Sequence, residues 1–165
     1  GFVAAIVVGF LLTAVQNWTG LRATHGKTLG ILMVVWLAAR LLMLFGAAAP
    51  VWLVVAVDLL FLPLAAVLLA IPLIKVQQQR NLFFVPVLFL LTFCNGLMHY
   101  GLLTNRFDMQ QLGSYNAVWL ITLLMVIVGG RVLPMFTANG TMTPKVQPIV
   151  WLDRLALGSL WLIFI

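Results

Sequence analysis

Charged side chains are scarce in this sequence, and acidic ones are the scarcest. Charged residues make up 7% of the 165 positions, and three of them are acidic. A soluble domain carries about 25% charged residues, so the composition excludes that class of protein. With three acidic residues in the whole chain, we also expect no catalytic site built on a pair of carboxylates.

Cysteine pairs and the motifs of soluble enzymes are lacking as well. Cys94 is the single cysteine, so the sequence encodes no intrachain disulfide, no thiolate metal cluster and no C-x-x-C-H haem attachment. It contains no P-loop, no G-x-G-x-x-G and no G-x-S-x-G. The seven methionines show no M-x-x-M spacing that would indicate a thioether copper site.

Long apolar runs make up most of the sequence. Hydrophobic residues make up 64% of the chain, and several runs reach the ~20 residues that a helix needs to cross a bilayer. Backbone polar groups in lipid must be satisfied internally, so these runs are expected to be helices. We predict an all-α, polytopic transmembrane bundle of about six helices, forming a single domain over residues 1–165. The expected helices cover residues 1–16, 29–45, 51–71, 82–103 and 115–133, and a sixth begins near Pro148.

Both ends of the chain lie inside apolar runs. The sequence opens on Gly1 within such a run and stops at Ile165 within another. We therefore expect a chain truncated at both ends, taken from a longer parent. Its expected partners are the lipid bilayer and the rest of that parent, and exposed apolar faces would also favour a homo-oligomer.

Basic residues collect in alternate loops. The segments Arg22–Lys27 and Lys75–Arg80, together with Lys145, carry most of them, while the intervening loops carry no net positive charge. The positive-inside rule then places these three loops in the cytoplasm. The net charge of +6 thus reflects membrane topology, and we expect no nucleic-acid partner.

Two opposite charges lie inside neighbouring apolar runs. Arg40 precedes the turn at residues 46–50, and Asp58 follows it at a similar spacing. In an antiparallel hairpin both would lie roughly 12 Å from the turn. Because isolated charges are costly in a membrane, we predict an Arg40–Asp58 contact. It would act either as a lock between two helices or as part of a proton or substrate relay.

Asn95 and His99 are four residues apart and therefore share one face of the helix expected at residues 82–103. An intramembrane histidine is usually a hydrogen-bonded residue of the bundle. It can also ligate a metal or haem through one ring nitrogen while a neighbouring group orients the other. Both interpretations remain open for His99.

The segment at residues 129–140, GGRVLPMFTANG, places an arginine and a proline near the end of an apolar run. Pro134 is expected to kink or end the helix there. Arg131 could snorkel to the membrane surface or form an interhelical clamp with Asp153, for which Arg154 would compete. Alternatively, its guanidinium could bind an anion.

Two segments together resemble the signature regions of NnrS family membrane proteins. They are GFLLTAVQNWTG at residues 9–20 and GGRVLPMFT at residues 129–137. The WLAARL segment at residues 36–41, the D-x-x-F-x-P pattern that begins at Asp58, and His99 add to the resemblance. It covers essentially the whole chain.

The resemblance implies a bacterial inner-membrane protein of about twelve helices that binds haem and copper. The family is associated with denitrification and with the response to nitric oxide. His99 would then be a haem or copper ligand, with Asn95 behind it and Arg131 in contact with a haem propionate. Family members carry a His-x-His-Glu segment just upstream of the position that matches Gly1. We therefore expect no cofactor on this chain alone.

Two other functions compete with this one. Arg40, Asp58 and His99 could form the intramembrane relay of a small-solute or ion transporter, although the sequence shows no convincing internal repeat of the kind such transporters carry. The chain by itself could also be an inactive helical piece. Whether the parent is an enzyme stays open. An absorbance spectrum with metal analysis separates the first two functions.

Overall fold

The structure is a computed structural model of the chain. It describes residues 1–21, 23–24, 26–46, 49–141, 151, 155 and 158–159, without the side chains of residues 80, 131–136 and 139. The chain divides into two compact units, Gly1–Tyr115 and Asn116–Ile165, and each is described by itself.

Every regular element in the described ranges is a helix. The helices are α1 (Phe2–Thr19), α2 (Lys27–Leu44), α3 (Val51–Lys75), α4 (Gln79–Leu82), α5 (Phe84–Leu103) and α6 (Phe107–Thr141). Five of those described are long and apolar enough to cross a membrane, and the four-residue α4 is the exception. The predicted all-α, multi-pass fold is confirmed. Of the helix predicted from Pro148, the structure describes residues 151, 155, 158 and 159, and the other positions lie outside the described residues.

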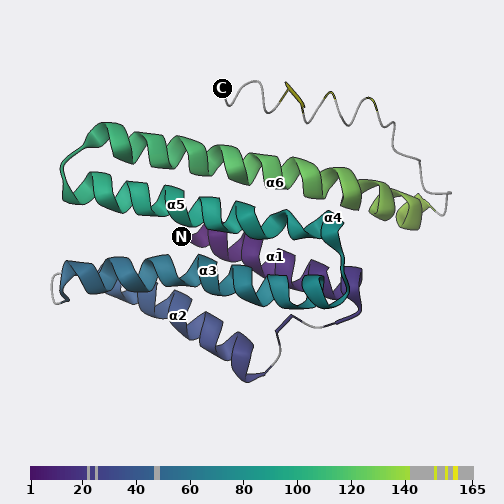
Figure 1. The fold of residues 1–165 in the computed structure, drawn as a ribbon, viewed down its shortest axis with the longest axis horizontal. Coiled ribbons are helices and arrows are strands. Elements are labelled where there is room, and N and C mark those ends of the chain that lie inside the picture. Colours follow the sequence, from purple (N-terminus) through teal and green to yellow (C-terminus); the bar gives the residue numbers. More distant parts are fainter. Residues whose placement is uncertain are drawn as a thin grey trace. The chain divides into compact units, whose positions relative to one another are not determined.

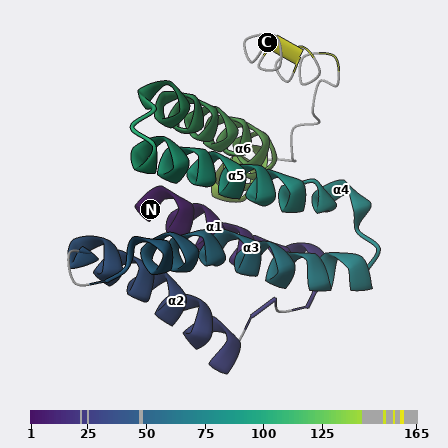
Figure 2. The same ribbon diagram turned by 60° about the vertical axis from the view of Figure 1, so that its left-hand side comes forward.

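Helix α3 is the central helix of the first unit. It packs against α1, α2 and α5, and both ribbon views show it between α2 and α5 (Figures 1 and 2). Ala65, Leu69 and Leu73 recur every four residues and are at most 1% exposed, so they form a stripe along one side of the helix. The fully buried Ala66 beside this stripe has the small side chain that lets membrane helices approach closely.

The connections after α1 and after α3 meet at one end of this unit (Figure 1). The Nε2 atom of Gln78 donates to the carbonyl oxygen of Trp18 at 2.8 Å, and the Nδ2 atom of Asn81 donates to Oε1 of Gln78 at 3.0 Å. The Trp18 ring stacks on Phe84 with centroids 5.3 Å apart. These contacts join the second predicted basic loop to the end of α1, the helix that leads into the first one.

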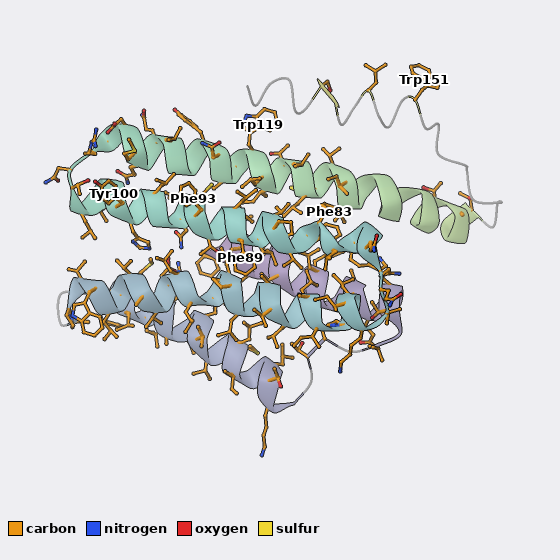
Figure 3. The ribbon with its side chains drawn as sticks, in the orientation of Figure 1. Phe83, Phe89, Phe93, Tyr100, Trp119 and Trp151 are labelled. Carbon is orange, nitrogen blue, oxygen red and sulfur yellow. The ribbon has the colours of Figure 1, made fainter. Side chains whose placement is uncertain are left out.

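The α2–α3 and α5–α6 turns lie at the opposite end (Figure 1). Figure 3 shows α5 running toward this end from the other one, with Phe83 just before its start and Tyr100 near the α5–α6 turn. At that turn, a Cβ on Gly101 would lie 2.6 Å from the backbone nitrogen of Gln110, and a Cβ on Gly113 would lie 2.6 Å from the carbonyl oxygen of Cys94. The two glycines allow the chain to fold back tightly here.

Several predicted helix boundaries were wrong. Helix α6 begins at Phe107 and not at Tyr115, because the polar residues before Tyr115 are compatible with a helix; Ser114 bonds back to the carbonyl oxygen of Gln110 at 3.1 Å. The helix also continues beyond Leu133 to Thr141, so Pro134 does not end it. Membrane helices tolerate proline when other groups satisfy the freed carbonyl.

Smaller boundary corrections apply to the other helices. Helix α1 continues past Gln16 to Thr19, and Gly20 then ends it in a left-handed conformation. Helix α3 continues past Ile71 to Lys75, with both Pro63 and Pro72 inside it. The helix predicted from Leu82 is divided at Phe83 into α4 and α5.

Candidate functional site: an Asp58 cluster between three helices

Asp58 is the centre of a polar cluster in the first unit. Its side chain lies in α3 and is 6% exposed. Arg40 from α2 bonds to its Oδ1 atom, and Asn95 and His99 from α5 bond to its Oδ2 atom. We call these four residues the Asp58 cluster. They join three membrane-spanning helices through one carboxylate.

The ion pair between Arg40 and Asp58 is the charged part of the cluster. The Nη2 atom of Arg40 lies against Oδ1 of Asp58, and the Arg40 side chain is 20% exposed. Arg40 and Asp58 were predicted to meet because they have a similar spacing from the α2–α3 turn. In the structure the two side chains are in contact. Each charge is the counter-ion of the other, so neither is left unpaired in an apolar environment.

Asn95 and His99 complete the shell of Asp58 from one face of α5. The Asn95 amide donates to Oδ2 at 2.7 Å, and Nε2 of His99 lies 2.9 Å from the same oxygen. The shared face was expected from the four-residue spacing, and the alternative relay had grouped His99 with Asp58, but the direct contacts of both residues with Asp58 were not predicted. A count of depth places Asp58, near the start of α3, and His99, near the end of α5, at the same end of the unit, but it does not show that α5 packs beside α3.

Two buried N–H groups near the cluster have no hydrogen-bond partner among the described residues. They are Nε1 of Trp36 and Nε of Arg40, one turn apart on α2. The ring of Phe2 packs edge-on against Trp36 with centroids 5.5 Å apart, and a Cβ on Gly1 would overlap the Arg40 guanidinium. The beginning of α1 therefore lies beside two donors that would suit an acceptor oxygen, such as that of a carboxylate.

The remaining predicted site residues are not brought into this cluster by the described structure. Arg131 belongs to α6 in the second unit, and its side chain lies outside the described residues. Asp153 and Arg154 lie outside them entirely. The Arg131–Asp153 clamp and the anion contact of Arg131 therefore stay predictions.

The Asp58 cluster offers one metal ligand and not a whole metal centre. Within the described part of the chain, no group of three or more His, Cys, Asp or Glu side chains could hold a metal ion. His99, however, has the arrangement that a ligating histidine usually shows, with one ring nitrogen bonded to a carboxylate. The residues present fit one ligand and its orienting partner, and other ligands would have to come from elsewhere.

Comparison with known protein families identifies a family for this chain. The model of the NnrS protein family matches residues 1–165, which is the full length of the chain. No curated protein and no solved structure matches it. Together with the helical membrane fold, this match shows that the chain belongs to the NnrS family.

Proposed function

We propose that the chain is part of a haem- and copper-binding protein of the bacterial inner membrane that acts in the response to nitric oxide. The observation that carries the proposal is the His99 imidazole, bonded to a buried carboxylate between three membrane helices in a member of the NnrS family. Bound haem or copper would supply nitric oxide binding and electron transfer. The residues of this chain would supply the ligand, its orientation and the charge balance around it.

Each member of the Asp58 cluster has a distinct part in this proposal. His99 offers an imidazole nitrogen, and Asp58 fixes the orientation of the ring. Asn95 holds the same carboxylate oxygen in place, and Arg40 balances the carboxylate charge. The unpartnered N–H groups of Trp36 and Arg40 would suit a carboxylate of haem.

The position of Gly1 supports a shared site. Gly1 lies against Arg40, which is bonded to Asp58. In a longer parent, a His-x-His-Glu segment just upstream of Gly1 would enter beside the Asp58 cluster. Histidines from that segment could then supply the ligands that the described residues lack.

Metal and haem content of the full-length parent test this proposal. The wild-type protein is expected to show a haem Soret band and stoichiometric copper after purification in detergent. His99→Ala should lose copper or change the Soret band, whereas His25→Ala, which removes the other histidine of the sequence, should keep both. An unchanged Soret band and copper content in His99→Ala would reject His99 as a ligand.

Transport is the second candidate function, favoured by the direct linkage of Arg40, Asp58 and His99 across three helices. Proton or solute uptake by proteoliposomes containing the full-length protein tests it. A transporter would show uptake that His99→Ala abolishes without any change in metal content. A metalloprotein would show the metal change and no uptake.

We further propose that Arg131 acts near the membrane face at which the basic loops lie. It would act there either in an interhelical clamp or in contact with a haem propionate. Haem retention in an Arg131→Gln variant separates the two roles. Full retention supports the clamp, and loss of haem without loss of folded protein supports the propionate contact.

The proposal also places the three basic loops in the cytoplasm. Lys27 begins α2 and Lys75 ends α3, and Gln78, just beyond α3, bonds to Trp18 near the end of α1. Single cysteines introduced at Lys75 and at Asn105 in a Cys94→Ala background test this orientation. An impermeant maleimide should label the cysteine at position 105 in intact spheroplasts, and the one at position 75 only after lysis.

A further inference from the structure

One end of the first unit carries positive charge that no described acidic residue balances. Lys75 is exposed in the last turn of α3, and Arg80 follows it on α4. The two acidic residues that the structure describes, Asp58 and Asp108, both lie toward the opposite end (Figure 1), and each has an arginine partner there. The end that carries Lys75 is therefore complementary in charge to an anionic partner.

The turn that follows Lys75 is held in place by hydrogen bonds. The backbone nitrogen of Gln78 bonds to the carbonyl oxygen of Leu73 at 2.9 Å. The Gln78 side chain donates to the carbonyl oxygen of Trp18 at 2.8 Å and accepts a bond from Asn81 at 3.0 Å. The backbone beside Lys75 is thus already ordered, which lowers the entropy cost of binding a partner there.

An apolar row along α3 leads up to Lys75. Val67, Ile71 and Lys75 are four residues apart, so they share one face of the helix. Val67 is 53% exposed and Ile71 46% exposed, and Lys75 is exposed at the end of the row. From Val67 to Lys75 the helix rises about 12 Å. A cation at the end of an apolar row of this length has the form that a phospholipid needs, with one site for the phosphate and a surface for an acyl chain.

We propose that the end of α3 binds an anionic phospholipid, with the headgroup phosphate against the Lys75 ammonium and an acyl chain along Val67 and Ile71. A net negative headgroup is favoured because the described acidic residues lie at the opposite end. A zwitterionic headgroup brings its own cation to the phosphate and gains less from Lys75. The Trp18 ring at this end is of the kind that marks the membrane–water interface. The inference goes beyond the proposed function and needs neither haem nor copper.

Lipid binding to the purified full-length protein tests this site. Native mass spectrometry compares the tightest binding event for palmitoyl-oleoyl phosphatidylglycerol with that for phosphatidylcholine carrying the same chains. We expect Lys75→Gln to weaken phosphatidylglycerol binding about 5-fold and to leave phosphatidylcholine binding nearly unchanged. Arg106→Gln is the matched control, because it removes the same charge at the opposite end and should change neither affinity.

Three results of these measurements would overturn the inference. Equal weakening by Lys75→Gln and Arg106→Gln would show attraction by the total charge of the protein instead of by a site. Equal weakening of both lipids by Lys75→Gln would assign the contact to the acyl chains alone. Displacement of phosphatidylglycerol by millimolar inorganic phosphate would show a site for a free anion and not for a lipid.

The wild-type protein supplies a test that depends on no variant. It should bind phosphatidylglycerol more tightly than phosphatidylcholine, and the difference should shrink as the salt concentration rises, because salt screens an exposed charge. Equal affinities for the two lipids, or a difference that salt does not change, would contradict the proposal even if Lys75→Gln failed to fold.

Discussion

Two pairs of arginine and aspartate lie toward the same end of the first unit and behave as opposites. Arg40 and Asp58 meet inside two membrane-spanning helices, with side chains 20% and 6% exposed. Arg106 and Asp108 meet at the α5–α6 turn at 3.7 Å, with side chains 54% and 61% exposed. The chemistry is the same, so the difference between the pairs isolates the effect of the surroundings.

The comparison teaches that the inner pair is constrained from both sides. Arg40 depends on Asp58 for its counter-charge, while Asp58 must also accept bonds from Asn95 and His99. The outer pair is open to solvent or lipid headgroups, where ions screen it and each partner is tolerable alone. A polar network inside the span is therefore a feature that can support function, and an exposed pair at a turn is not.

The largest expected effect comes from Asp58→Ala. Removing the carboxylate leaves Arg40 as an uncompensated buried charge, so the free energy of unfolding should fall by about 3–5 kcal/mol. Reversible unfolding of the purified protein in mixed micelles measures this change. Asp108→Ala is the matched control, and equal losses for the two variants would erase the distinction between the pairs.

An intermediate effect is expected from Gly101→Ala at the turn that carries the outer pair. The new methyl group would overlap the backbone nitrogen of Gln110 at 2.6 Å and the carbonyl oxygen of Arg106 at 2.8 Å. Because backbone atoms cannot move aside easily, we expect a loss of about 1–3 kcal/mol in the same unfolding measurement. Gly9→Ala is the control, since nothing lies within 4 Å of a Cβ at that position. A neutral Gly101→Ala would mean that the turn is looser than the structure shows.

The smallest effect is expected from Arg106→Ala. An exposed ion pair contributes about 0–1 kcal/mol, and salt should reduce even that contribution. Unfolding curves at low and high salt check both points. A loss that matched the Asp58→Ala variant, or that grew with salt, would show that the outer pair is not the simple exposed contact described here.

The sequence was sufficient for the inner ion pair because its geometry is local. Arg40 and Asp58 flank a single tight turn, so helix rise alone places them at one depth. The shared face of Asn95 and His99 is local in the same way, since it follows from their four-residue spacing. Both could be read without knowledge of the tertiary fold.

The contacts of Asn95 and His99 with Asp58 could not be predicted from such local spacing. They require α5 to pack beside α3, and the continuous apolar composition of both helices gives no stripe that would indicate which faces meet. The extent of α6 was also missed, because Gln110, Gln111 and Ser114 read as a polar loop and Pro134 as a helix end. The structure shows helix at all four positions.

A double-mutant cycle between Arg40 and Asp58 tests most directly the claim that the Asp58 cluster acts as one unit. Arg40→Met, Asp58→Leu and the double variant would be compared by reversible unfolding in mixed micelles. We predict that the double variant loses clearly less stability than the two single variants combined, with a coupling energy above about 1 kcal/mol. Losses that add within about 0.3–0.5 kcal/mol would show that the two side chains act independently and would contradict the account.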